Sequence, residues 1–326
     1  MTAGVPIIDA AAIDGALTRA DAVAAIEDAL RGGQDVEADT PRLFRRLEAG
    51  EFLLMPAESA DHAGVKVATV APGNPANGLP KIQAWYLVFD AATLSPVAIL
   101  DGTSLTTLRT PAVTGAAVRA LLRSDPRGAR DRIDRLAVLG SGPQAEAHVR
   151  TLADILSVGR VDVVGRTPER VRACVDALAS AGIDARVGSR SDLPLADVIV
   201  TTTSSAEPVV DLADVAPNAV VAAIGAHGAD ARELGADLVR AADVVVEARA
   251  SAWRESGDLL LARPADDWRR EGRVANLREL VAEGIRRREG VPAVYTGVGM
   301  SWEDLAVVER VLDTIRTQGT EIGDGR

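Results

Sequence analysis

The stretch "RLAVLGSGPQAEAHV", residues 135–149, decides the fold of this chain. An apolar run ends at Gly140, and a segment with helical spacing follows. Gly140 permits a tight turn, Gly142 lets a pyrophosphate approach the backbone, and Ala145 lets the helix pack closely on the strand. The helix N-terminus then faces the phosphates. The pattern predicts a dinucleotide site, and the alternative is a glycine-rich turn without a ligand. The predicted contacts are Gly140, Ser141, Gly142, Pro143 and Gln144.

Apolar runs alternate with helical segments on both sides of this turn. The runs cover residues 135–140, 161–165, 196–203, 218–225 and 242–248. Near-continuous apolar strands that alternate with helices indicate a parallel sheet covered on both faces. We therefore predict an α/β fold in which residues 123–299 form a Rossmann-type, doubly wound domain.

The remaining residues predict a second, α+β domain. Short strand-like runs separated by turn signals fill residues 40–108 and indicate an antiparallel sheet. A helix is expected over 109–124, with Thr110 as its cap and Pro111 at its first position. An amphipathic helix is expected over 301–319. We predict that residues 1–122 plus 300–326 form this domain and that the Rossmann domain is inserted into it.

Composition narrows the class of partner. The formal net charge is −11, from 36 basic and 47 acidic residues, which argues against nucleic acid and anionic membranes. No signal peptide and no membrane span are predicted, so we expect a cytoplasmic protein. The single cysteine, Cys174, excludes a disulfide within the chain and falls on an apolar helix face. No metal site is predicted.

The end of the second strand of the α/β domain bears on the choice of cofactor. An acidic residue there would bind the ribose 2′-hydroxyl of NAD. The chain has "VVGRTPER" instead, with Arg166, Thr167 and Arg170. Guanidinium and hydroxyl groups suit a 2′-phosphate, so NADP(H) is favoured and NAD(H) is the alternative. The arginines could otherwise be solvated charges at a helix start.

Hydroxyl residues follow the next strand, at the carboxyl edge where ligands bind in open α/β sheets. They are Thr202, Thr203 and Ser204, and we predict that they line the cofactor cleft. The alternative is that they cap strand and helix ends.

Three cations stand out in the first domain. They are Arg42, Lys66 and Arg109, and the chain has only two lysines, Lys66 and Lys81. Together the three would bind a carboxylate and leave a proton donor in place, because a buried lysine can lose its proton and an arginine cannot. Spacing alone leaves open that each is a surface charge.

The chain resembles the ornithine cyclodeaminase/mu-crystallin family along nearly its whole length. The resemblance is carried by "PRLFRRLEAGEFLLMPA", "GVKVATVAPGNPANGLPKIQAWYLVFD", "AILDGTSLTTLRTPAVTGAA", "LGSGPQAEAH", "VVGRTPERV", "ADVIVTTTSSAEPVV", "AAIGAHGADARELGADLV" and "GVGMSWEDLAVVERV". It implies the two-domain fold predicted above and a homodimer paired through the sheet of the first domain. It also implies that Arg42, Lys66 and Arg109 hold a substrate carboxylate and that Lys66 donates the proton.

The segment 225–234 indicates the branch of the family. The cyclodeaminases resemble one another in a Gly-Gly-Asp turn, whereas this chain has Gly225, Ala226 and His227. The "ADAREL" that follows resembles the ketimine reductase and alanine dehydrogenase branch. His227 is expected to relay a proton or bind the substrate, and the alternative is a hydrogen bond to the turn backbone.

Two further features depart from the family. Pro111 stands where the family usually has alanine, and "YTGVGM" replaces a Lys-Ser-x-Gly pattern, which puts Thr296 and Gly297 in the cleft. Beyond the residues above, the predicted set contains Gln83 and Gly297 for the substrate and Thr110, Gly225 and Met300 for the cofactor.

The sequence thus predicts an NADP(H)-dependent reductase of small α-imino acids, or the reverse amino acid dehydrogenase. Two alternatives stay open. One is a cyclodeaminase that keeps NAD bound. The other is a non-catalytic protein that binds NADPH and a small acid, as mu-crystallin-like members would.

Overall fold

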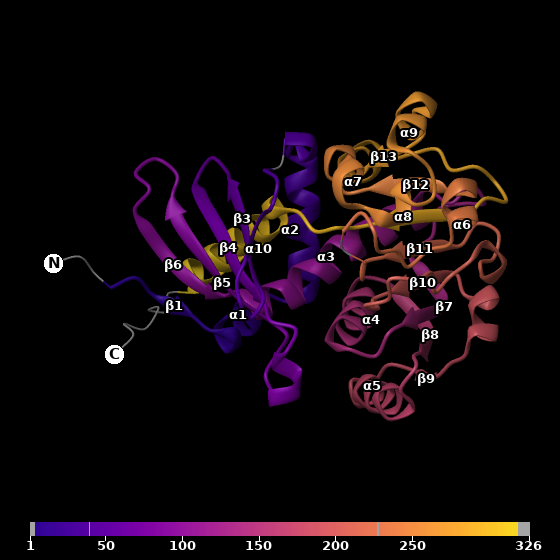
Figure 1. Ribbon diagram of the computed structural model, residues 1–326, viewed down its shortest axis with the longest axis horizontal. Helices are drawn as coiled ribbons and strands as arrows, with labels where there is room; N and C mark the ends of the chain where they lie inside the picture. Colours follow the sequence, from indigo (N-terminus) through magenta and orange to yellow (C-terminus); the bar gives the residue numbers. More distant parts are fainter. Residues whose placement is uncertain (1–3, 39, 227, 319–326) are drawn as a thin grey trace. The chain divides into compact units, whose positions relative to one another are not determined.

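The computed structural model describes residues 4–38, 40–226 and 228–318. These divide into two compact units. Unit 1 comprises the described residues of Met1–Ile26, Ala38–Thr110 and Gly299–Arg326. Unit 2 comprises Glu27–Glu37 and Pro111–Val298. Each unit has its own sheet (Figure 1).

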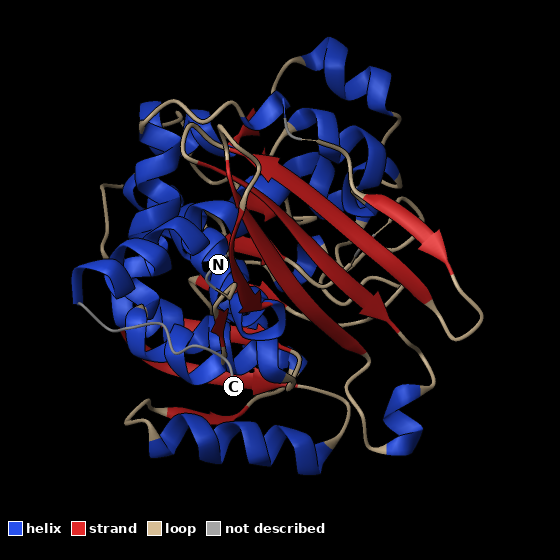
Figure 2. Ribbon diagram, turned by 90° about the vertical axis from the view of Figure 1, so that its left-hand side faces the viewer, coloured by secondary structure: helices blue, strands red, loops and turns tan. Residues whose placement is uncertain are grey.

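The described part of unit 1 contains a six-stranded sheet in the order β1-β6-β5-β4-β3-β2. Its strands are β1 (Ile7–Ile8), β2 (Leu43–Arg46), β3 (Glu51–Glu58), β4 (His62–Val70), β5 (Ile82–Asp90) and β6 (Pro96–Asp101). Strands β2 to β6 pair antiparallel, as predicted. The strands of the structure are the red arrows of Figure 2. Strand β1 adds a parallel pair at the β6 edge. Helix α1 (Ala10–Ala16) packs on β6, and helix α2 (Arg19–Arg31) follows it.

The two faces of this sheet differ in character. Helix α10 (Ser301–Gln318) packs against β3 and β4, which confirms the predicted C-terminal helix. The cross-strand row on the buried face consists of Met55, Lys66, Tyr86 and Leu100. Because successive residues of a strand point to opposite faces, the next row lies on the other face. That row consists of Leu43, Leu54, Val67 and Trp85.

The described part of unit 2 contains an eight-stranded parallel sheet in the order β13-β12-β14-β11-β10-β7-β8-β9. Its strands are β7 (Arg132–Leu139), β8 (Ser157–Val164), β9 (Ala185–Val187), β10 (Val198–Thr201), β11 (Val220–Ala223), β12 (Asp243–Val246), β13 (Ala275–Asn276) and β14 (Ala293–Thr296). Every residue of β10 and β11 is buried, as in a sheet covered on both faces. The predicted doubly wound α/β fold is therefore confirmed.

The helices of unit 2 connect these strands. They are α4 (Pro143–Ile155), α5 (Pro168–Ser180), α6 (Ala236–Ala241), α7 (Arg249–Glu255), α8 (Gly257–Leu260) and α9 (Ala265–Glu271), with a π-helical turn at Glu279–Glu283. Cys174 is buried on α5, as its helical spacing predicted. Within the described ranges, no helix combines the length and the apolar character needed to cross a bilayer.

The predicted start of the helix at residue 109 was wrong. Helix α3 (Gly102–Arg123) begins where β6 ends, and Pro111 lies inside it. The Asp101 carboxylate accepts a hydrogen bond of 2.7 Å from the Ser104 backbone N–H, so it satisfies a donor of the first turn. The Thr106 hydroxyl donates to the Gly102 carbonyl within the same segment. The helix therefore begins at the Asp101 cap, and Pro111 is accommodated inside it with the loss of one helical hydrogen bond.

Candidate active site

The glycine turn after β7 is built so that only glycine fits. Gly140 has a φ of +121°, and its N–H donates to the Val164 carbonyl at 2.9 Å. A Cβ atom at residue 140 would lie 2.5 Å from the Thr202 hydroxyl oxygen. Strand β7 lies between β8 and β10, so chain connections leave it in both directions. This is the topological switch point at which open α/β sheets bind ligands.

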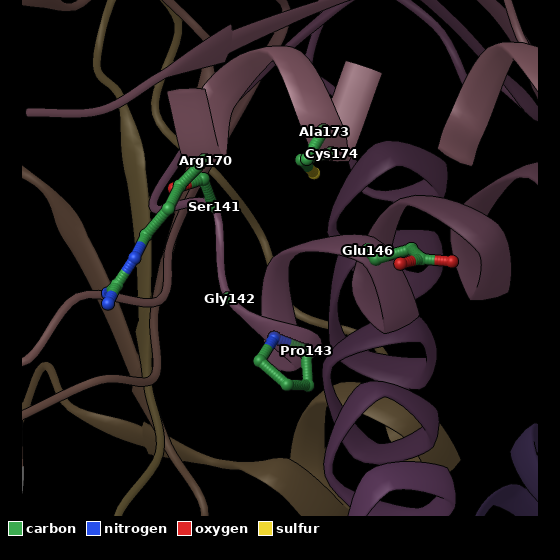
Figure 3. Close-up of a pocket in the computed structure, with 7 residues that line it drawn as sticks. All are labelled: Ser141, Gly142, Pro143, Glu146, Arg170, Ala173 and Cys174. Atoms are coloured by element: carbon green, nitrogen blue, oxygen red, sulfur yellow. The ribbon is translucent and has the colours of Figure 1, made fainter. Parts of the chain in front are cut away.

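The N-terminus of helix α4 faces this turn with its backbone donors. Gly142 is the N-cap and supplies no capping side chain, and Pro143 occupies the first turn. A cavity of about 310 Å³ opens beside it. Ser141 and Arg170 lie at one end of this cavity and Pro143 at the other (Figure 3). Uncapped N–H groups at a helix start bind phosphate, so this cradle fits the pyrophosphate of a dinucleotide.

The start of helix α5 offers a second anion site. Thr167 is its N-cap, yet the hydroxyl makes no capping hydrogen bond. Arg166, Thr167 and Arg170 are all exposed at this end of β8. Two guanidinium groups and a hydroxyl at the carboxyl end of the second strand suit a ribose 2′-phosphate.

A buried carboxylate that the sequence did not reveal organises the next two strand ends. Glu233 is 0% exposed. One oxygen accepts the Thr203 backbone N–H and hydroxyl, both at 2.7 Å. The other accepts the Gly225 N–H at 2.6 Å and the Thr201 hydroxyl at 2.8 Å. Glu233 thus ties the ends of β10 and β11 together and fixes Thr203 and Gly225, two of the predicted cofactor residues.

Asp258 supports the segment that carries Glu233. One of its oxygens accepts the backbone N–H groups of Glu233 and Leu234, at 2.9 and 2.8 Å. Burial raises the pKa of Asp258 to about 6, and the backbone hydrogen bonds oppose that rise only in part. A carboxyl group inside unit 2 therefore titrates close to neutral pH.

The second group of predicted residues comes together in unit 1. The Lys66 ammonium donates to Asp304 at 2.6 Å. The Arg109 guanidinium donates to Asp304 through Nε at 3.1 Å and to Glu303 through Nη1 at 2.7 Å. Lys66 is 3% exposed, Arg109 6%, and both carboxylates 0%. The structure thus brings Lys66 and Arg109 to one buried cluster, whose acidic members the sequence did not reveal.

The cluster gives Lys66 the proton affinity of a general acid. Burial lowers the pKa of Lys66 from 10.5 to about 8, and the Arg109 charge adds to that effect. Asp304 and, more weakly, Glu303 oppose it. A lysine with a pKa near 8 is protonated at neutral pH and can still give up its proton.

Other predicted residues of unit 1 lie elsewhere. Arg42 is half-buried, with its guanidinium carbon 5.9 Å from the centre of the Phe44 ring. Gln83 is exposed and pairs with Thr69, on the sheet face opposite to Lys66. Met300 is 2% exposed, just before α10. Thr110 follows Arg109 in α3 and is half-buried.

The remaining predicted residues fall in unit 2 or outside the description. Ser204 is exposed, and Thr202 donates from its hydroxyl to the Leu139 carbonyl at 3.2 Å. Gly297 packs so closely on Glu247 that a Cβ atom would lie 2.8 Å from a carboxylate oxygen. His227, the predicted proton relay, lies outside the described residues.

Known proteins resemble this chain over most of its length. The Delta(1)-pyrroline-2-carboxylate/Delta(1)-piperideine-2-carboxylate reductase of Azospirillum brasilense is 33% identical over 314 residues, 95% of this chain and 96% of the relative. The Delta(1)-pyrroline-2-carboxylate reductase 2 of Burkholderia ambifaria is 35% identical over 276 residues, 84% of each chain. An archaeal alanine dehydrogenase dimer with bound NAD has a TM-score of 0.83 at 25% identity, with 97% of both chains covered.

The family profile covers almost all of the sequence. The ornithine cyclodeaminase/mu-crystallin family matches residues 6–319, which include the glycine turn, both predicted arginines and Lys66. The resemblance inferred from the sequence blocks is confirmed. The chain belongs to the ornithine cyclodeaminase/mu-crystallin family.

Proposed function

We propose that this protein is an NAD(P)H-dependent reductase of small α-imino acids, which in the reverse direction oxidises the corresponding amino acids. The observation that carries the proposal is the buried lysine with a pKa near 8, hydrogen-bonded in one cluster with an arginine. Its relatives named as pyrroline- and piperideine-2-carboxylate reductases support the same class of reaction. The substrate class is an α-imino acid, cyclic or linear, with a free carboxylate.

Reduction of a C=N bond consumes a hydride at carbon and a proton at nitrogen. When bound, the reduced nicotinamide supplies the hydride. Lys66 supplies the proton, because it is the buried cation whose pKa permits transfer near neutral pH. Arg109 holds the substrate carboxylate in exchange for its hydrogen bonds to Glu303 and Asp304, since a guanidinium binds a carboxylate through two parallel hydrogen bonds. Arg42, whose guanidinium lies over the Phe44 ring, is the second arginine that the family resemblance assigns to the carboxylate. In the oxidative direction Lys66 accepts the proton, so the same group serves both directions.

The cofactor is held by backbone groups of the Gly140 turn and the α4 N-terminus. NADP(H) is preferred over NAD(H), because Arg166 and Arg170 offer positive charge and Thr167 an uncommitted hydroxyl to a 2′-phosphate. Thr202, Thr203 and Gly225 contribute from the neighbouring strand ends, and Glu233 holds the last two in place.

The active protein is a homodimer paired through the outer face of the unit 1 sheet. Trp85 is 50% exposed there, and Leu43 in the same cross-strand row is exposed as well. An apolar row of this kind on a monomer marks an interaction surface. Light scattering tests the assignment: twice the 34.0 kDa chain mass is expected, and a monomer at micromolar concentration would exclude it.

One set of assays separates the proposed reductase from the other outcomes. The purified protein is mixed with NADPH or NADH and Δ1-pyrroline-2-carboxylate, Δ1-piperideine-2-carboxylate, or pyruvate with methylamine. Loss of reduced-nicotinamide absorbance with at least one imino acid is expected, with NADPH preferred. Ammonia release from ornithine or lysine without added cofactor would instead establish a cyclodeaminase. Cofactor binding without either reaction would establish a non-catalytic binder.

A further inference from the structure

Two adjacent acidic residues in the first turn of α10 contact the proposed catalytic lysine and arginine unequally. Asp304 uses one oxygen for Lys66, at 2.6 Å, and the other for Arg109, at 3.1 Å. Glu303 accepts a hydrogen bond of 2.7 Å from Nη1 of the Arg109 guanidinium. Asp304 therefore bridges both cations, whereas Glu303 holds one of them.

The groups around Lys66 come from four elements. Asp304 and Glu303 come from α10 and Arg109 from α3. Tyr86 of β5 and Met55 of β3 are its cross-strand neighbours on the same face. The two cations and two carboxylates balance in charge, so each buried charge of the cluster has a partner of opposite sign. Removing one carboxylate leaves an excess positive charge beside Lys66.

We propose that Asp304 is a positioning residue that sets the protonation of Lys66 and fixes its orientation, whereas Glu303 orients Arg109 alone. The proposal rests on the proposed function, because it assigns Lys66 to proton transfer and Arg109 to carboxylate binding. Asp304 acts on kcat and its pH dependence through Lys66, and on KM through its second contact, with Arg109. Glu303 acts on KM through Arg109.

The physical basis is the distance between the charges. A carboxylate within hydrogen-bond distance of an ammonium group raises the pKa of that group by about 1 to 3 units. Asp304 is the stronger of the two acids acting in this direction, while burial and Arg109 act against it. Without Asp304, the opposing effects lower the pKa of Lys66 further below 8. Lys66 is then largely neutral at pH 7 and no longer a competent acid.

The two lysines of the chain permit a direct measurement that needs no activity. Protein labelled with ¹³Cε-lysine gives two side-chain signals, Lys66 and the exposed Lys81, and K81R assigns them. In the wild type the Lys66 signal is expected to titrate near pH 8. D304N should lower that midpoint by about 1 unit or more, and E303Q should move it less.

Kinetics give the second reading, measured in the direction of imino acid reduction. The rate of the wild type should fall above about pH 8, as Lys66 loses its proton. In D304N this fall in rate should begin at lower pH, and kcat at pH 7.5 should be reduced by about tenfold or more. E303Q should move this pH dependence less than D304N does and raise KM about tenfold, because one charged hydrogen bond to Arg109 is lost.

Glu309→Gln is the matched control. Glu309 lies further along α10, and its hydrogen-bond partners are Ser59, in the turn after β3, and His62, at the start of β4. E309Q removes a carboxylate from the same helix, so a merely structural effect of α10 would appear in it too. E309Q should keep the wild-type titration midpoint of Lys66, the wild-type pH dependence of the rate and the wild-type KM.

Defined outcomes decide the inference. Equal Lys66 midpoints in D304N and wild type, or equal shifts in D304N and E303Q, would overturn it. If D304N does not fold by circular dichroism, D304E keeps the charge but displaces it by one methylene. D304E is expected to keep the midpoint near 8 and lose at least about fivefold in kcat, and wild-type kcat would overturn the inference. If the wild type reduces no imino acid, the proposed function fails, and the lysine titration still decides the role of Asp304.

Discussion

The glycine turn of unit 2 and the charged cluster of unit 1 reach a functional site by opposite routes. The turn uses backbone N–H groups, is partly exposed, and comes from consecutive residues around Gly140 and Gly142. The cluster uses side chains, is nearly inaccessible to water, and joins residues 195 and 238 positions apart. A phosphate site made of backbone N–H groups requires room for the ligand, and it does not depend on particular side chains around it. A buried charged side chain needs a partner of opposite charge, and in the Lys66 cluster an element far away in the sequence supplies that partner.

The strongest test of this contrast removes the lysine. Lys66→Met should reduce kcat by about a thousandfold, since general acid catalysis contributes about 10² to 10⁴ in rate. NADPH affinity should stay within twofold, roughly, because the cradle consists of backbone groups of the Gly140 turn and the α4 N-terminus and does not use the Lys66 side chain. Steady-state kinetics and calorimetric titration with NADPH measure the two quantities. Lys81→Met is the control, and turnover by K66M near the wild-type rate would remove Lys66 from the mechanism.

The second test concerns a side chain that supports the backbone cofactor site of unit 2. That side chain is Glu233. Glu233→Gln replaces one acceptor by an amide donor facing backbone N–H groups of Thr203 or Gly225. We expect NADPH affinity to fall about thirtyfold and the melting temperature to drop, because a buried donor pair is left unsatisfied. Glu207→Gln, on the exposed loop after β10, should leave both unchanged. Unchanged NADPH affinity in E233Q would show that the cradle forms without this carboxylate.

The third test compares two buried acids. Asp304 faces cations, whereas Asp258 is held by backbone N–H groups and its pKa is raised from 3.8 to about 6. The folded state then binds more protons than the unfolded state between these values, so stability is lost as pH rises toward 6. Relative to Asp258→Asn, the wild type should lose about 2 to 3 kcal/mol of unfolding free energy between pH 4 and about 6.5. Urea titrations at several pH values measure this, and parallel curves would contradict the buried ionisation.

The smallest expected effect concerns cofactor choice. Arg166→Ala with Arg170→Ala should lower the preference for NADPH over NADH about tenfold, since each exposed charge contributes about 1 kcal/mol or less. Arg172→Ala removes an exposed arginine from the same helix that pairs with Glu169, and it should leave the preference unchanged. The ratio of kcat/KM for the two cofactors is the measurement. An unaltered ratio would mean that the 2′-phosphate is recognised elsewhere.

The sequence predicted the features that depend on local pattern. The Gly140 turn, the apolar strands that follow it and the C-terminal amphipathic helix all depend on residues close together in the chain, and the structure has all three. The start of α3 was predicted wrongly, because Pro111 is a strong local signal and the cap at Asp101 a weak one.

The acidic partners could not be predicted in the same way. Glu303 and Asp304 lie on an amphipathic helix, where acidic residues usually face solvent. Glu233 follows a turn, so the sequence predicts that it is exposed. Only the packing of α10 on the unit 1 sheet shows that Glu303 and Asp304 are buried, and only the joined ends of β10 and β11 show it for Glu233. A buried Lys66 needs an acidic partner, so the sequence suggests that such a residue exists. It does not show which acidic residue is the partner.

The position of α10 in the chain also has a consequence for biosynthesis. The ribosome makes β4 and the start of α3 long before residue 304, so Lys66 and Arg109 emerge with neither Glu303 nor Asp304 available. An unpaired ammonium is costly to bury, and the inner face of the first sheet therefore stays open to water during synthesis of unit 2. That face can close only after α10 has been made, so a helix synthesised after β7 to β14 completes a sheet whose strands were synthesised before them.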